Sequence, residues 1–308
     1  MSLDVSIVIV NHSGDQLTTA CLDSLLAIQP IDGLIHVFVV DNGSPHNYEL
    51  PKRFLKTKQL DITLLRSESN LGFTGGNNMG IHAAIERHNS DYVLLLNNDT
   101  LVEPSFLQKM ILFADSNPAA GIISSKIYFA KGREFFSDSY ARSEKGKVLW
   151  YAGGSIDWAN LDCFHRGVDE IDRGQFAQQV ESDFATGCCA LIRREVLEKI
   201  GFLDKKYFLY YEDADWSQKA KAFGYRIGYC DAAVVWHINA GSSQGPGSLL
   251  QLYYQTRNRL FFFWRYGTTK VKTTVARLSF SLLLHGSKMQ KFAVWHFITG
   301  KQGKQPLS

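Results

Sequence analysis

The chain has 308 residues and a net charge of +3, and its 45% hydrophobic and 20% charged residues are typical of a globular protein. No apolar run approaches the length of a membrane span, and the first ten residues lack the basic region and cleavage site of a signal peptide. The five cysteines show no metal-binding spacing, because Cys188 and Cys189 are adjacent. We therefore expect reduced, mostly buried thiols in a cytoplasmic protein of one large domain or two smaller ones.

Charge is distributed unevenly along the chain. After Asp231 there are ten Lys and Arg residues and no Asp or Glu, which leaves the first 231 residues with a net charge of −7. Such a basic segment predicts an anionic partner: a membrane surface, a lipid phosphate or nucleic acid. Nucleic acid is disfavoured, because the tail has no recognised motif and the rest of the chain is acidic. A solvated helical face is the alternative interpretation, which the complete lack of carboxylates weakens.

Predicted strands and helices alternate over the first 130 residues. The strands, each a short apolar run, are predicted at residues 5–10, 36–40, 61–66, 92–96 and 121–129. The helices are predicted at residues 18–27, 48–55, 77–87 and 104–115. This alternation predicts an α/β fold whose mostly parallel sheet is covered on both faces. Because polar residues follow the strands, we expect the ligand at the sheet edge that gathers Asn11, Asp41, Asn70 and Asp99.

The strand at residues 92–96 stops abruptly at Asn97, Asn98 and Asp99. A carboxylate flanked by two amides at the carboxyl end of a strand suits a hard divalent cation, which prefers oxygen ligands. An Asn/Asp turn that only ends the strand is the alternative.

Residues 69–80 are rich in glycine and precede a predicted helix. Glycines let the backbone approach a phosphate or sugar closely, and a helix N-terminus favours anions. The spacing of Gly72, Gly75, Gly76 and Gly80 matches neither Gly-x-Gly-x-x-Gly nor the Walker A motif. The signal is therefore generic, and a plain loop in which Asn78 or a neighbour caps the helix is the alternative.

The second half begins with an aperiodic region, residues 131–173, which we interpret as hairpins and loops that cover the sheet. The remaining strands are predicted at residues 183–192, 226–229 and 233–236. The remaining helices are predicted at residues 194–200, 212–223 and 249–266, with one or two basic amphipathic helices within residues 269–299. A basic amphipathic helix can lie on a membrane, and it can equally be a dimerisation or packing element.

Three carboxylates, Glu212, Asp213 and Asp215, open the helix predicted at residues 212–223. Acidic residues in a first helical turn are stabilised by the helix dipole, which is a purely structural explanation. Adjacent Glu212 and Asp213 behind aromatic residues also suit a general base whose pKa is set by burial. His237 follows the last short strand, where an imidazole could complete a metal site begun by Asp99.

In this order the motifs resemble family-2 inverting glycosyltransferases with the GT-A fold, and among them the rhamnosyltransferase-like branch. The matching stretches are VSIVIVN (5–11), VVDNGS (39–44), NLGFTGGNNMG (70–80), LLLNND (94–99), ATGCCA (185–190), FLYYEDADW (208–216) and VWH (235–237). Several are weak individually, but their order and spacing together are specific. Beyond residue 240 the resemblance is loose and rests on Tyr253-Tyr254 and Arg257-Asn258-Arg259.

The resemblance implies a role for each matching residue. Asn11 and Asp41 would hold the nucleotide base and ribose, while the nucleotide and sugar pocket would be lined by Asn70, Gly72 and Asn77 or Asn78. At the family's Asp-x-Asp position stand Asn97, Asn98 and Asp99, of which Asp99 would bind the Mg²⁺ or Mn²⁺ that bridges the donor diphosphate. His237 would be a further metal ligand and Asp213 the catalytic base. Contacts to the donor sugar or acceptor are expected among Gly187, Glu212, Asp215, Trp216, Arg257 and Arg259.

One departure from the family pattern is Asn97, because an amide in place of the first acidic residue lowers the charge of the metal site by one. We expect residues 1–245 to form the GT-A domain. Residues 246–308 would form a basic, aromatic helical segment that faces a membrane or the acceptor, or that joins two chains in a homodimer.

The expected activity is transfer of L-rhamnose from dTDP-L-rhamnose to a hydroxyl of a growing, lipid-linked cell-surface glycan. The enzyme would work in the cytoplasm or on the inner face of the cytoplasmic membrane, with residues 131–173 as an acceptor-side flap. A UDP-hexose or UDP-galactofuranose donor is the alternative on the same scaffold. A non-catalytic nucleotide-sugar-binding module is the alternative from another class.

Overall fold

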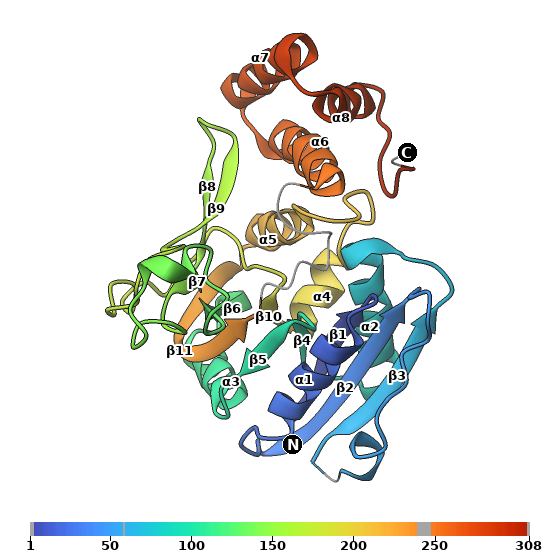
Figure 1. Cartoon of the computed structure of the whole chain (residues 1–308), viewed down its shortest axis with the longest axis vertical. Helices are drawn as coiled ribbons and strands as arrows, with labels where there is room; N and C mark the ends of the chain where they lie inside the picture. The colour runs from blue at the N-terminus through green and yellow to red at the C-terminus, as the bar shows by residue number, and fades with distance from the viewer. Residues whose placement is uncertain (1–2, 58, 239–247, 307–308) are drawn as a thin grey trace.

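A computed structural model describes residues 3–57, 59–238 and 248–306 (Figure 1). Its strands are β1 (Leu3–Asn11), β2 (Gly33–Asn42), β3 (Asp61–Ser67), β4 (Tyr92–Leu96), β5 (Thr100–Val102), β6 (Ala120–Phe129), β7 (Leu149–Tyr151), β8 (Gly154–Asp157), β9 (Asp162–His165), β10 (Cys189–Arg193) and β11 (Arg226–His237). Its α-helices are α1 (Asp15–Leu25), α2 (Gly72–His88), α3 (Phe106–Ser116), α4 (Arg194–Ile200), α5 (Glu212–Ala222), α6 (Leu249–Tyr266), α7 (Thr269–His285) and α8 (Lys288–Ile298). Two 3-10 turns, η1 (Phe54–Lys56) and η2 (Ser137–Ser139), complete the described elements.

The central sheet is mixed and mostly parallel, as predicted. Its strand order is β3-β2-β1-β4-β10-β6-β11-β5, with β7 paired to β6. The β1, β2, β3 and β4 strands run parallel, and β6 runs parallel to β11. Strand β10 lies antiparallel between β4 and β6, and it joins the two parallel groups into one sheet.

Helices cover both faces of this sheet, and the alternation of β1 shows how. Val5, Ile7 and Ile9 point into one apolar cluster, which includes residues of α1 and α3. Val8 points into the opposite cluster, which includes Ile81 of α2 and residues of α4 and α5. Successive side chains of a strand point to opposite faces, so a strand with apolar side chains on both faces must be covered on both.

The prediction of a helix at residues 48–55 was wrong. The structure describes all of these residues, and the only helical element among them is the short turn η1, which begins at Phe54. Pro51 disfavours the helical conformation at the residue before it. The backbone N–H of Tyr48 instead donates to Asp41 Oδ2 at 2.9 Å.

The glycine-rich segment is part of a helix rather than a loop before one, because α2 begins at Gly72 and not at residue 77. Gly76 and Gly80 face β1, where an added Cβ would lie 2.7 Å from a side-chain atom of Val10 and 2.3 Å from one of Val8. These glycines therefore let α2 pack closely on the sheet.

The strands also differ from the prediction in three ways. The strand predicted at residues 183–192 begins only at Cys189, and β5 was not predicted. The two short strands predicted at residues 226–236 are one strand, β11, with an irregularity between Cys230 and Val234.

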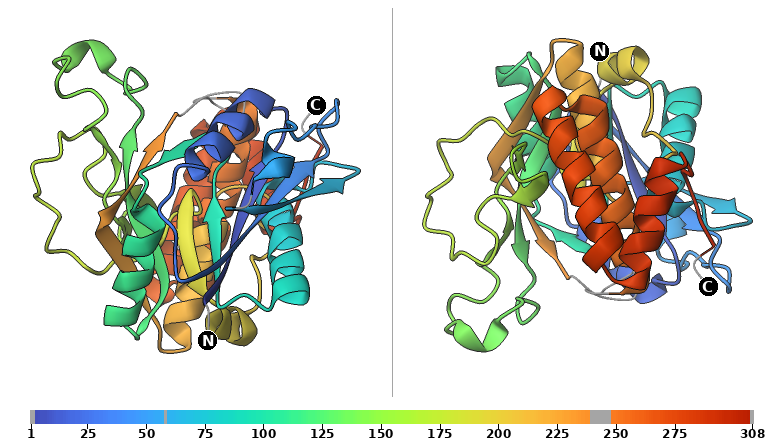
Figure 2. Two further views of the ribbon diagram at one scale, coloured as in Figure 1. Left: turned by 90° about the horizontal axis from the view of Figure 1, so that it is seen from below. Right: turned by 90° about the horizontal axis from the view of Figure 1, so that it is seen from above.

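The C-terminal helices α6, α7 and α8 pack on one another at the end of the molecule farthest from β2 and β3 (Figures 1 and 2). Among the described residues, none of the helices is both long enough and apolar enough to cross a bilayer. The boundary predicted between residues 245 and 246 lies outside the described residues.

Candidate active site

A cavity of about 610 Å³ lies where β4 and β11 end. Its lining comes from several parts of the chain. The strand ends and the segment before β10 contribute Asn97, Asp99, His237, Phe184, Thr186, Gly187 and Cys188. The start of α5, strand β9 and helices α6 and α8 contribute Glu212, Asp213, Asp162, Cys163, His165, Gln255, Arg259 and Gln290. Its walls thus combine carboxylates, imidazoles and amides, which can bind a polar ligand by hydrogen bonds and charge.

At the strand-end side of the cavity, Asp99 Oδ1 lies 3.2 Å from His237 Nε2. His237 ends β11, whereas Asp99 lies in the turn between β4 and β5, and the antiparallel pairing of β11 with β5 places His237 opposite Thr100. Both side chains are more than nine-tenths buried and both line the cavity. A carboxylate oxygen and an imidazole nitrogen at this separation fit a shared divalent cation, so the residues predicted as metal ligands are brought together.

A second group of potential metal ligands occurs in the described part of the chain, but at the opposite end of the sheet. His36 and Asp61 face each other near the beginnings of β2 and β3, and His88 ends α2. The imidazole rings of His36 and His88 are stacked, with centroids 3.5 Å apart and planes 14° apart. The lone pair of an imidazole nitrogen lies in the plane of its ring. Because the two ring planes are nearly parallel, the lone pairs of His36 and His88 do not converge on one ion, so we assign this cluster to packing.

Asp213 and Glu212 stand together at the N-terminus of α5 and both line the cavity. Asp213 Oδ2 accepts a hydrogen bond from the Gly187 N–H at 3.1 Å, and Oδ1 accepts one from the Ala214 N–H at 2.8 Å. Burial raises the pKa of Asp213, although these two N–H groups oppose the rise.

Glu212 lacks such support, because its buried Oε2 has no hydrogen-bond partner. Burial, reinforced by the charge of Asp213, raises the pKa of Glu212 well above its ordinary value. Burial raises the pKa of both carboxyl groups, but only Asp213 accepts N–H bonds that favour its ionised form, so Asp213 is the better candidate for a base.

The segment before α5 has a strained backbone. Phe208, Tyr210 and Tyr211 have φ angles of 68°, 69° and 71°, a region that non-glycine residues rarely adopt. Each such residue raises the free energy by about 1–3 kcal/mol, so surrounding contacts must hold it. We call residues 207–211 the arch, because they carry the chain over to the start of α5.

Asn258 of α6 supplies the main contacts to the arch. Its Nδ2 donates to the carbonyl oxygens of Tyr207, Leu209 and Tyr210 at 3.0, 2.8 and 2.9 Å. Its Oδ1 accepts from Arg257 Nε at 2.9 Å, which fixes the orientation of the amide. Helix α6 therefore holds the loop that positions Asp213.

The residues predicted to bind the nucleotide lie at the expected sheet edge, outside the lining of the cavity. Asn11 Oδ1 accepts from Gly14 N–H and Thr18 Oγ1, both at 3.0 Å, and so caps the start of α1. Asn70 Oδ1 accepts from the Gly72 N–H at 2.8 Å, at the start of α2. These bonds shape the edge, and the proposed contacts of both residues to a nucleotide stay predictions.

Asp41 is nearly fully buried at the same edge and is surrounded by donors. Burial alone would raise its pKa, but hydrogen bonds from Ser44 and the backbone N–H of Tyr48, together with the charge of Arg66, lower the pKa of Asp41 overall. A carboxylate held ionised in this way can accept hydrogen bonds from ligand hydroxyls.

Asn77 and Asn78 lie outside the lining of the cavity, and their predicted contacts to a nucleotide sugar stay predictions. Asn78 Nδ2 donates to the Leu203 carbonyl at 2.8 Å, and its Oδ1 accepts from the Leu203 N–H at 3.1 Å. Asn77 Nδ2 donates to the Phe73 carbonyl within α2 at 2.9 Å. Asn78 thus joins α2 to the segment after α4. Asn98 is likewise turned inward, with Nδ2 donating to Thr18 Oγ1 at 3.0 Å.

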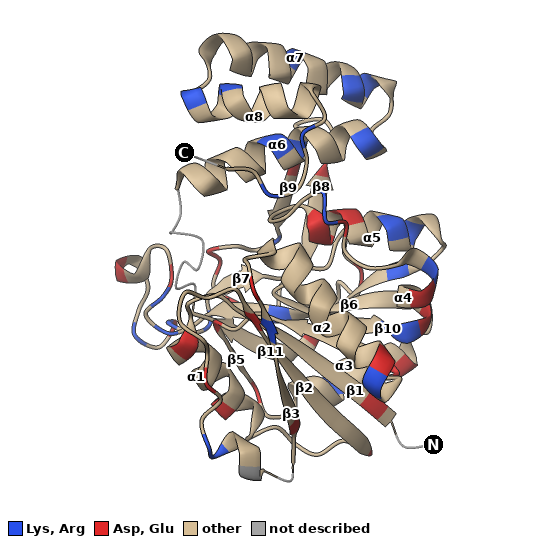
Figure 3. Cartoon of the chain, turned by 90° about the vertical axis from the view of Figure 1, so that its right-hand side faces the viewer, with Lys and Arg blue, Asp and Glu red and all other residues tan. Residues whose placement is uncertain are grey.

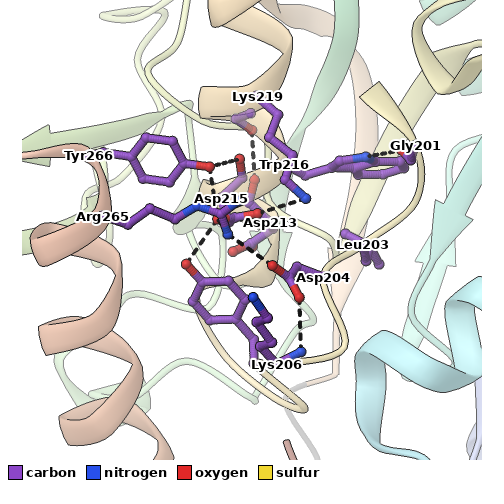
Figure 4. Close-up of polar contacts among 12 residues, drawn as sticks. Gly201, Leu203, Asp204, Lys206, Asp213, Asp215, Trp216, Lys219, Arg265 and Tyr266 are labelled. Atoms are coloured by element: carbon purple, nitrogen blue, oxygen red, sulfur yellow. Dashed lines mark hydrogen bonds and ion pairs between the residues drawn. The ribbon is translucent and has the colours of Figure 1, made fainter. Parts of the chain in front are cut away.

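Asp215, Trp216 and Arg257 were predicted as ligand contacts; in the structure each of them binds groups of the protein, and their contacts to a ligand stay predictions. Asp215 is fully buried, and its Oδ1 accepts from Tyr266 Oη at 2.9 Å and from Arg265 at 3.0 Å, which ties α5 to α6 (Figure 4). Trp216 Nε1 donates to the Gly201 carbonyl at 2.9 Å within the core. The buried guanidinium of Arg257 donates to the Lys206, Tyr207 and Gly303 carbonyls.

The remaining candidates, Gly187, Glu212 and Arg259, do line the cavity. Sequence reasoning missed several other lining residues, above all Trp150, Asp162 and His165 from the aperiodic region. His165 Nδ1 lies 3.1 Å from the Trp150 carbonyl, and burial lowers the pKa of His165 to about 4. The only signal in the sequence was the cluster of aromatic residues in residues 150–164, which does not identify a cavity.

This fold and this strand-end cavity agree with comparisons to known proteins. The sequence profile of Glycosyl transferase family 2 matches residues 6–201. The hexosyltransferase Agl10 of low-salt glycan biosynthesis from Haloferax volcanii is 28% identical over 83% of this chain and 74% of its own length. An N-acetylglucosaminyl-diphospho-decaprenol L-rhamnosyltransferase from Mycobacterium tuberculosis is 24% identical over 72% of this chain and 73% of its own length.

Among solved structures, GalNAc-T7 with UDP, GalNAc and Mn²⁺ superimposes with a TM-score of 0.64 at 15% identity, covering 98% of this chain and 55% of that chain. That similarity shows the GT-A fold. Because the profile covers well over half of the sequence, the chain belongs to glycosyl transferase family 2.

Proposed function

We propose that this chain is a metal-dependent, inverting glycosyltransferase that transfers L-rhamnose from dTDP-L-rhamnose to a hydroxyl of a growing glycan. The observation that carries the proposal is the shared cavity, which brings the Asp99–His237 pair and the carboxyl group of Asp213 together in a family-2 chain. Inversion needs a single base, and Asp213 is the carboxylate whose N–H partners favour ionisation.

The steps assigned to protein groups follow from this geometry. Asp99 and His237 would hold a divalent cation, which when bound neutralises charge on the diphosphate leaving group as a Lewis acid. Asp213 accepts the proton of the acceptor hydroxyl as its oxygen forms a bond to the anomeric carbon, while the bond from that carbon to the diphosphate breaks. The raised pKa of Glu212 disfavours a second negative charge beside Asp213, which favours Asp213 as the base of the pair.

We further propose that the acceptor glycan is carried on a lipid diphosphate. The relative from Mycobacterium tuberculosis is named for such an acceptor, and the cavity extends to Gln255 of α6 and Gln290 of α8. Basic helices at this end of the cavity suit an anionic carrier.

A donor panel tests the activity. Purified chain is incubated with dTDP-L-rhamnose, UDP-hexoses and UDP-galactofuranose, each with Mg²⁺, Mn²⁺ or EDTA, and nucleotide release is measured with and without a lipid-diphosphate sugar acceptor. We expect acceptor-dependent release with dTDP-L-rhamnose and a divalent cation only. Release with a UDP donor would replace the proposed donor, and binding of a donor without release from any of them would indicate a non-catalytic module.

The arch gives a second prediction. Asn258→Ala removes a donor shared by three carbonyls of a strained segment, of which that of Tyr207 keeps its bond from Arg257. We therefore expect a stability loss of about 2–3 kcal/mol and a fall in kcat of roughly 10²-fold. Denaturant unfolding and initial rates measure the two effects. Asn117→Ala is the matched control, because Asn117 Nδ2 donates to the Phe113 carbonyl at 2.9 Å far from the cavity. An Asn258→Ala variant that is folded and as active as the Asn117→Ala variant would refute this role of α6.

A further inference from the structure

The outer faces of α7 and α8 combine large apolar side chains with basic ones. On α7, Phe280 and Leu284 lie one helical turn apart and are 64% and 54% exposed. On α8, Trp295 and Ile298 are 55% and 56% exposed. The buried side of α7, which includes Val271 and Val275, faces the neighbouring helices. Apolar residues this exposed, on adjacent helices, mark a contact surface.

Basic residues accompany this apolar stripe. Helical spacing places Arg277 beside Phe280 on α7, and Lys288 and Lys291 on the same side of α8 as Trp295. In Figure 3, α6, α7 and α8 carry Lys and Arg and no Asp or Glu, as expected for a sequence without a carboxylate after Asp231. We call Arg277, Phe280, Leu284, Lys288, Lys291 and Trp295 the basic-aromatic face.

The distribution of charge decides between the partners that could cover this face. A twofold contact between two copies would bring the same positive charges against each other, because both subunits use the same patch in such an interface. An anionic bilayer instead attracts the basic-aromatic face and repels the rest of the chain, whose net charge through residue 231 is −7. Trp295 is suited to the interfacial region, where tryptophan rings are favoured.

We infer that the basic-aromatic face docks the protein on a bilayer that contains anionic phospholipid. Gln290 of α8 lines the cavity and lies about 200° around the helix from Lys288, so α8 has one side toward the cavity and the other in the basic-aromatic face. Docking therefore places the cavity next to a helix that lies on the membrane surface. A lipid-borne acceptor would then reach the cavity from the bilayer, a consequence that rests on the proposed function. The docking itself does not depend on it.

Co-sedimentation of the full chain with vesicles tests the inference without donor or acceptor. Vesicles of phosphatidylcholine alone are compared with vesicles that contain phosphatidylglycerol. We expect binding to the anionic vesicles only, and weaker binding at high salt. Lys288→Gln and Lys291→Gln should each weaken binding about fivefold, and Trp295→Ser at least about tenfold.

Matched controls remove similar groups from the α/β body: Lys52→Gln and Lys147→Gln for the charges, and Leu112→Ser, on α3, for the exposed apolar side chain. They should change binding by less than about twofold. Equal binding to both kinds of vesicle, binding to neither, or controls that weaken binding as much as the test variants would overturn the inference. Vesicle binding without sugar transfer would support docking and reject the proposed function, whereas transfer to a lipid acceptor without vesicle binding would reject docking alone.

Discussion

Replacing Asp213 by asparagine is expected to lower the rate of sugar transfer by roughly 10²–10⁴-fold while leaving donor affinity nearly unchanged. Asparagine keeps the shape of the side chain and can still accept the Gly187 N–H bond, but it cannot accept a proton from the acceptor hydroxyl. Initial rates at saturating donor and calorimetric titration of the donor measure the two quantities. Full turnover by Asp213→Asn would remove Asp213 as the base.

Glu212→Gln is the matched control, because it removes the neighbouring carboxyl of the same pair. A glutamate that is already protonated has the same charge as glutamine, so we expect the rate to change by only a few-fold. The reverse pattern, with Glu212→Gln inactive and Asp213→Asn active, would make Glu212 the base.

The dependence of the rate on pH follows from the same pair. Burial raises the pKa of Asp213, and a general base acts only when it is ionised. The rate should therefore fall as the pH is lowered through that raised pKa, at a pH above the range where an exposed aspartate titrates. In Asp213→Asn the residual rate should lose this acid limb.

Much of this site could be predicted because its residues end strands. A short apolar run bounded by polar residues, such as residues 92–96, predicts a buried strand, and in a parallel sheet the polar residues that follow such strands gather at one edge. Asp99 and His237 are 138 positions apart in the sequence, and their pairing depends on β5, which was not predicted, and on β11, which was predicted as two short strands. Their positions after predicted strands and the order of the motifs connected the two residues.

The predicted contacts that lie outside the lining of the cavity have a common physical explanation, which is the direction of side chains on a helix. Positions 213 and 215 are about 200° apart around α5, so only one of the two carboxylates can face the cavity. Asp215 instead joins α5 to Arg265 and Tyr266 of α6. Arg257 was expected to contact the ligand from the resemblance alone, and in the structure it donates to the backbone carbonyl of Tyr207 in the arch. A motif shows which residues are near a site and does not show which way they point.

Removing the carboxylate of Asp99 should abolish the contribution of a divalent cation to donor binding. In Asp99→Ala the imidazole of His237 loses the oxygen 3.2 Å away with which it would share the cation. We expect donor affinity measured with Mg²⁺ or Mn²⁺ to fall by at least about 100-fold, down to the affinity of the unaltered chain in EDTA. Calorimetric titration of the donor, with each cation and with EDTA, measures this difference.

Asp61→Ala is the control, since it removes a carboxylate from the His36–Asp61–His88 cluster at the opposite end of the sheet. If that cluster only packs, Asp61→Ala keeps the cation dependence of donor binding. If it held the functional cation, Asp61→Ala would lose that dependence and Asp99→Ala would keep it, which would move the metal site away from the cavity. Asp99 and Asp61 lie at opposite ends of the sheet, so a local structural change caused by one substitution does not reach the other site. The variant that loses the cation dependence of donor binding therefore identifies the site that holds the ion.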